Sequence, residues 1–195
     1  MARTVWDRQI APKVCWFDRL RAWLFYLPAA LLWLVLAIRY RSFTLLTAAN
    51  PSFECGGFVG ESKLQVMAQV APHAMSWFAP QSSMVRSIES DSVDADLALA
   101  VSALAYAGLQ FPIVAKPDRG HHGFGVSPIY DDVDLKSYIE TFPPGETLVL
   151  QTLVPFAYEA GVFYIRRPGE QFGQLFSLNF SCSPHVVGDG KSTLV

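Results

Sequence analysis

The 195-residue chain has few charged residues and no block of basic ones. Charged side chains make up 16% of the sequence, and the formal net charge is −2 at pH 7. Proteins that bind the nucleic-acid backbone normally carry a basic face, because each phosphate is negatively charged. The composition therefore argues against a nucleic-acid partner. The length suits one domain, or one domain with an appendage.

Cysteine and histidine are also scarce, with three and four residues respectively. Cys15, Cys55 and Cys182 lie far apart, and no two of them have the spacing of a metal-binding or redox pair. The odd number argues against a disulfide framework and favours a reducing, cytoplasmic location. The histidines form no HxxxH or HExxH pattern. We therefore expect no transition-metal site, and no residue is predicted to be a metal ligand.

Apolar residues are concentrated in one stretch near the N-terminus. Residues 22–38, AWLFYLPAALLWLVLAI, carry no charge, and arginines stand beyond both ends. This length is at the lower limit for a helix that spans a bilayer. We expect a helix with three possible arrangements: it spans a membrane, lies in the membrane interface, or packs against the protein's own surface. Membrane association through 22–38 is therefore one expectation.

The order of predicted elements divides the chain into three parts. Residues 1–44 form an N-terminal segment that contains the hydrophobic helix. Residues 45–104 form a linker rich in turn residues, followed by a helical part in which a short helix begins near Lys63. Residues 105–195 form the main domain, which alternates strands and helices. The predicted fold class is α/β (α+β).

The most informative stretch is residues 111–126, FPIVAKPDRGHHGFGV. An apolar run ends at Lys116 and leads directly into a loop that contains Gly120, Gly123 and Gly125. This pattern predicts a buried strand, a flexible loop and a second strand. Glycines let backbone N–H groups approach a polyanion closely, and the lysine adds a positive charge for phosphate oxygens. The alternative is a glycine-rich hairpin that binds nothing.

The predicted elements that follow are a helix after Asp131, a strand over 147–151, and two further strands. This order, the segment QTLVPFAYE (151–159) and the segment VVGDGKSTL (186–194) resemble the ATP-grasp superfamily. The likeness is to carboxylate–amine ligases of the kind that includes D-alanine–D-alanine ligase, glutathione synthetase and cyanophycin synthetase. It covers about residues 45–195, and it implies a partial ATP-grasp domain preceded by the hydrophobic helix.

The resemblance implies that ATP is the cofactor and gives several residues a role. Lys116, as the catalytic residue, and Lys63 would neutralise the phosphates, and the loop from Gly120 to Gly125 would close over them. Three residues of the segment 151–159 would hold the nucleoside. Gln151 would accept from the adenine amino group, the backbone at Val154 would face the adenine, and Glu159 would bind the ribose hydroxyls.

The resemblance also implies a reaction, in which ATP activates a carboxylate as an acyl phosphate and an amine then displaces phosphate. The acidic and asparagine ligands for Mg²⁺ in such ligases come downstream of the VVGDGKSTL segment. We therefore expect them beyond residue 195, in a longer enzyme. Two alternatives remain: a non-catalytic nucleotide-binding fragment, or a membrane-tethered interaction protein. The sequence does not identify the carboxylate substrate.

Overall fold

The computed structural model describes residues 20–58, 60–89, 93–121, 123–156, 158–182 and 190. These residues fall into two compact units. Leu31–Val154 form one unit, and the described residues on either side of this range form the other. The fold is mixed α+β, and both of its sheets are antiparallel. Most of the residues predicted to form a site belong to Leu31–Val154.

The elements follow one another in the order predicted for the main domain. The helices are α1 (Ala22–Arg39), η3 (Leu45–Ala49), η4 (Glu54–Gly57), α2 (Lys63–Ala68), η5 (Pro72–Trp77), α3 (Val93–Tyr106) and α4 (Asp132–Thr141), where η denotes a 3-10 helix. The strands are β1 (Gln81–Val85), β2 (Ile113–Pro117), β3 (Ser127–Ile129), β4 (Thr147–Thr152), β5 (Tyr158–Ile165) and β6 (Gln174–Cys182). The predicted succession of strand, glycine loop, strand, helix and strand is confirmed by β2, β3, α4 and β4.

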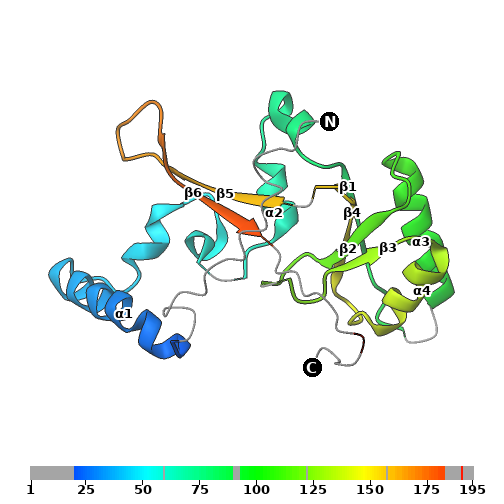
Figure 1. The fold of residues 1–195 in the computed structure, drawn as a ribbon, viewed down its shortest axis with the longest axis horizontal. Helices are drawn as coiled ribbons and strands as arrows, with labels where there is room; N and C mark the ends of the chain where they lie inside the picture. The colour runs from blue at the N-terminus through cyan, green and yellow to red at the C-terminus, as the bar shows by residue number, and fades with distance from the viewer. Residues whose placement is uncertain are drawn as a thin grey trace. The chain divides into compact units, whose positions relative to one another are not determined.

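Four strands of the larger unit form one sheet in the order β1-β4-β2-β3 (Figure 1). Strand β4 is central and lies antiparallel to both β1 and β2. Side chains of a strand alternate between the two faces of a sheet. One face therefore receives Ile113 and Ala115 of β2 together with Leu148 and Leu150 of β4, all of them fully buried. These residues face the helices and form the centre of the core.

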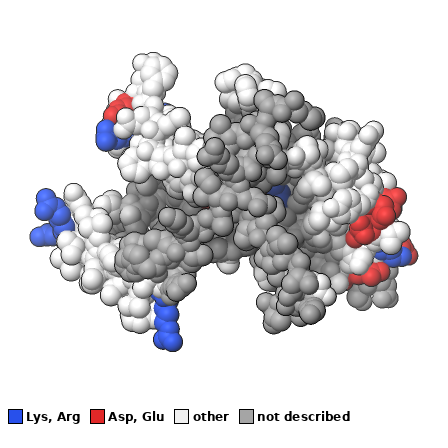
Figure 2. Space-filling view, in the orientation of Figure 1, with Lys and Arg blue, Asp and Glu red and all other residues white. Residues whose placement is uncertain are grey.

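Helices α3 and α4 cover that face of the sheet (Figure 1). Ala100 and Leu104 of α3 and Leu135 and Ile139 of α4 complete the core. Figure 2 shows that acidic side chains gather over these two helices. Asp131 begins α4, where its carboxylate accepts hydrogen bonds from two backbone N–H groups of the first turn, as predicted. The opposite face of the sheet is therefore the one that carries Lys116.

The hydrophobic run forms helix α1, as predicted. Within the described ranges, no helix is both long enough and apolar enough to cross a bilayer. The other compact unit contains the hairpin of β5 and β6, paired from Tyr158 with Cys182 to Ile165 with Gln174. The two further strands predicted after 147–151 are confirmed as β5 and β6.

Candidate functional site

Lys116 lies on the face of the sheet away from α3 and α4, because it alternates with the core residues of β2. Its Nζ donates a 2.6 Å hydrogen bond to Oε1 of Gln151 on the neighbouring strand β4. Partial burial lowers the pKa of the Lys116 ammonium, and the positive charge of Lys63 lowers it further. The structure thus brings the two predicted phosphate-binding lysines close enough to repel each other. An anion placed beside them would relieve that repulsion.

Lys63 is the first residue of α2, and its side chain points to the loop that follows β2. Nζ donates to the backbone carbonyl oxygens of Pro117 and Asp118 at 2.9 and 3.0 Å, and to that of Gly120 at 3.4 Å. An ammonium group has three donors, so these contacts occupy all of them. In this arrangement Lys63 fixes the start of the glycine loop, and its charge acts on the site through space.

Asp118 joins α2 to the end of β2, a role that sequence reasoning missed. Its buried carboxylate accepts from Leu64 N–H at 2.9 Å, and its carbonyl oxygen accepts from the backbone N–H of Lys63. Its own N–H donates to Thr147 on the edge of β4. The available signal was an acidic residue directly after Lys116-Pro117, but its partner lies 54 residues earlier in the chain. Asp118 therefore positions Lys63.

Replacing Asp118 with alanine should destabilise the chain by about 1–2 kcal/mol, the usual effect of removing a helix-capping carboxylate. The reason is that Leu64 N–H, part-buried at the start of α2, would lose its acceptor. Urea unfolding would measure the loss. Asp94→Ala is the matched control, because the Asp94 side chain is 85% exposed in its ion pair with Lys136. Equal effects of the two substitutions would contradict the capping role.

The glycine loop folds back on the end of β2. Gly123 and Gly125 both have φ of +72°, a conformation that glycine adopts readily and other residues rarely. A side chain on Gly125 would lie 3.1 Å from Cδ of Pro117, whereas one on Gly123 would meet nothing within 4 Å. Backbone hydrogen bonds from Phe124 to His121 and from Val126 to Gly123 close two successive turns. The loop is therefore compact.

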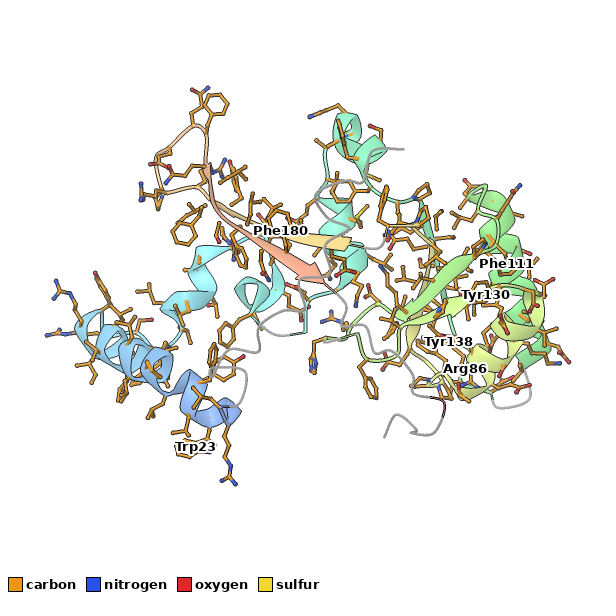
Figure 3. All side chains as sticks on the ribbon, viewed as in Figure 1. Trp23, Arg86, Phe111, Tyr130, Tyr138 and Phe180 are labelled. Carbon is orange, nitrogen blue, oxygen red and sulfur yellow. The ribbon has the colours of Figure 1, made fainter. Side chains whose placement is uncertain are left out.

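Helix α4 holds this loop from the other side, because the hydroxyl of Tyr138 donates a 2.6 Å hydrogen bond to the carbonyl oxygen of Gly125. Figure 3 shows Tyr138 between α4 and the strands of the sheet. Burial raises the pKa of the Tyr138 hydroxyl to about 12, so the hydroxyl remains a donor at neutral pH. Its ring also stacks on Phe142, with the ring centroids 5.6 Å apart.

Tyr138→Phe should cost about 1 kcal/mol at pH 8, the typical net value of one hydrogen bond. We expect this advantage of the wild type to shrink as the pH rises from about 10, the ordinary tyrosine pKa, to about 12. In that window the unfolded chain releases the Tyr138 proton while the folded chain retains it, so the free energy of unfolding falls with pH. Urea unfolding of both chains across this range measures the difference. A constant difference would contradict the assignment.

Arg119 ties the same loop to the segment before α2. Its guanidinium forms an exposed ion pair with Glu54 of η4 at 2.8 Å and donates to the carbonyl oxygen of Gly60. In η4 itself, Gly56 has φ of +69°, and a side chain there would lie 2.4 Å from the carbonyl oxygen of Thr47. Only glycine fits that position. Glu54 and Gly60, in the stretch predicted to be a linker, thus contact the residue directly before the glycine loop.

The residues predicted to hold the nucleoside are only partly brought together. Gln151 lies beside Lys116 on β4, where its Oε1 accepts from Lys116 and its Nε2 donates to the carbonyl oxygen of Ala79 at 3.0 Å. Val154 follows β4 and is half-exposed. Glu159 is on β5, in the other compact unit. The segment 186–194 lies outside the described residues except for Gly190.

The described residues contain no group of three or more metal-ligating side chains that could hold an ion. Two carboxylates close to the start of the glycine loop have other partners: Asp118 accepts from Leu64 N–H, and Glu54 pairs with Arg119. What the site offers is two ammonium groups beside a glycine-rich turn, and none of the ion pairs found among the described residues involves either one. No protein-family profile matches the chain, and comparison with curated proteins finds no match.

Proposed function

We propose that this chain binds the phosphates of ATP through Lys116 and the loop from Gly120 to Gly125, as part of an ATP-grasp domain. The observation that supports the proposal most directly is the pair of lysines. Lys116 and Lys63 repel each other, and neither forms an ion pair with a carboxylate among the described residues. A polyphosphate supplies several negative charges at one place and would stabilise both ammonium groups.

The glycine loop supports the same ligand. Its two residues of positive φ, Gly123 and Gly125, turn the backbone between the lysine strand and β3, and such turns can direct N–H groups at an anion. Lys63 and Tyr138 contact the two ends of the loop at Gly120 and Gly125, and Arg119 holds the residue before it. A loop held at both ends loses less conformational entropy when it binds a ligand.

The reaction class that we propose for the complete domain is ATP-dependent carboxylate–amine ligation. A carboxylate oxygen would attack the γ-phosphorus and release ADP, and an amine nitrogen would then attack the acyl phosphate, releasing inorganic phosphate and a proton as the amide forms. Positioned positive charge is the main catalytic device in phosphoryl transfer. The described residues do not fit a Mg²⁺ site, so no step through the metal is derived from them.

A ligand series tests the proposal on the full chain. Calorimetric titration with ATP, inorganic tripolyphosphate and adenosine should give the tightest binding for ATP, weaker binding for tripolyphosphate and little for adenosine. We expect this order of affinities because the lysines and the glycine loop would bind the phosphate groups. If adenosine bound with the same affinity as ATP, the chain would recognise the nucleoside alone, and this result would contradict a phosphate site.

Gly125→Ala and Gly123→Ala form a matched pair for the loop. Both replace a glycine at φ of +72°, so both should carry a similar backbone cost of about 1 kcal/mol. Only the Gly125 variant presses a side chain against Pro117, next to Lys116. We expect it to bind ATP roughly fivefold more weakly than the Gly123 variant, a difference of about 1 kcal/mol. Equal affinities would mean that the turn at Pro117 does not shape the site.

A further inference from the structure

Helix α1 is apolar on almost every side and most of it is exposed. Within α1, only Ala37 is buried and Leu36 partly so among the residues whose side chains are described. The exposed apolar side chains of the helix include Trp23, Phe25, Tyr26, Leu32, Val35 and Ile38. Figure 3 shows Trp23 pointing away from the N-terminal end of the helix. A helix that is hydrophobic all round normally lies in a protein core or against lipid.

The charges around α1 have one sign. No aspartate or glutamate occurs from residue 19 to residue 53, whereas the same stretch contains Arg19, Arg21, Arg39 and Arg41. The last three are exposed at the two ends of the helix. Figure 2 shows basic side chains near both ends of α1. An apolar surface bordered only by arginine matches a surface that is apolar inside and negatively charged outside, which is the surface of an anionic phospholipid bilayer.

The groups at the two ends of α1 are of the kinds that lie at the surface of a bilayer. The 18 residues of α1 extend about 27 Å, with arginine at each end. Trp23 and Tyr26 lie near the first end and Tyr40 follows the second, and such rings prefer the depth of the lipid headgroups. When the helix lies parallel to the bilayer, all of these groups reach that depth together. The exposed apolar surface of α1 continues into an open groove of about 300 Å³ between α1 and η3, lined by Trp33, Leu45 and Leu46 among others.

We propose that α1 and η3 dock on the surface of an anionic phospholipid bilayer, with α1 in the plane of the interface. This inference is independent of nucleotide binding, because Lys116 and the glycine loop take no part in it. The charge pattern distinguishes lipid from a second copy of the chain: two copies that met through α1 would bring the arginines of both together without any acidic residue from this stretch to pair with them.

Co-sedimentation of the full chain with vesicles tests the proposal. The chain should bind vesicles that contain phosphatidylglycerol and phosphatidylcholine much more tightly than vesicles of phosphatidylcholine alone. An arginine near an anionic surface contributes about fivefold to partitioning, so Arg39→Gln with Arg41→Gln should weaken binding roughly 20- to 30-fold. Val35→Asp, at an exposed position of α1, should weaken it at least tenfold because it places a charge in the apolar surface.

Matched controls come from surfaces outside α1. Arg166→Gln with Arg167→Gln removes two exposed arginines around the end of β5, and Val133→Asp adds a charge at an exposed position of α4. Both should bind vesicles like the wild type. Failure of a folded wild-type chain to bind either vesicle, equal binding to both, or wild-type binding by the Val35→Asp chain would overturn the proposal. The proposal would also be overturned if the chain self-associated instead of binding vesicles and Val35→Asp abolished that self-association.

Discussion

Replacing Lys116 with alanine is expected to weaken ATP binding roughly 10- to 150-fold, a loss of about 1.5–3 kcal/mol. That is the usual value of a hydrogen bond to a charged group, and none of the ion pairs found among the described residues involves Lys116, whose Nζ donates to Gln151. Lys63 cannot take over its role without breaking its contacts with three carbonyl oxygens. Calorimetric titration with ATP measures the change.

Lys136→Ala is the matched control for this substitution. Lys136 is exposed on α4, where it pairs with Asp94 at 2.7 Å. Its removal takes away the same charge but should leave the affinity for ATP within about twofold, because exposed charges are strongly screened by water and salt. If both variants lost affinity equally, the attraction would be a general effect of net charge. The assignment of Lys116 would then be wrong.

Leu150→Ala is expected to destabilise the larger unit by about 2–5 kcal/mol, the range measured for buried leucines. Leu150 is fully buried on the central strand β4, opposite Ala115 of β2, and packs in the cluster formed by the sheet and the two helices. Its neighbour Gln151 carries the contact with Lys116. A cavity at this position therefore weakens the core, and it also weakens the pairing of β2 and β4 that positions Lys116 and Gln151.

Leu99→Ala is the control, since Leu99 lies on α3 with 51% of its surface exposed. Its truncation should cost less than about 1 kcal/mol, because little apolar area returns to water. Denaturant unfolding of both variants gives the comparison. A loss at Leu150 no greater than that at Leu99 would mean that β4 is not the centre of the core.

Elements were predictable wherever a local pattern determines them. The apolar run gave α1, Asp131 marked the start of α4, and the order of strands, glycine loop and helix around Lys116 is confirmed. Local patterns were less reliable at the ends of elements. The sequence signal for the end of the short helix α2 is Pro72, but α2 stops at Ala68 and Pro72 begins η5.

The contacts of the candidate site could not be predicted, because they join residues far apart in the chain. Lys63 meets its carbonyl partners across more than fifty residues, and Arg119 reaches Glu54 across 65. Asp96 illustrates the same limit. An aspartate in the first turn of a helix is typically an exposed capping charge, but Asp96 is buried and accepts from the backbone N–H of Ser87 before the helix. Only the tertiary fold determines which polar groups such residues meet.

The central claim is that Lys116 lies beside the phosphates of bound ATP, and affinity labelling tests it most directly. An acyl phosphate derivative of ATP transfers its acyl group to a lysine amine that lies next to the bound phosphates, and a lysine with a lowered pKa is the better nucleophile. Mass spectrometry of the digested full chain should find Lys116 labelled, and excess ATP should prevent the labelling. Labelling spread over exposed lysines such as Lys136, unchanged by ATP, would contradict the account.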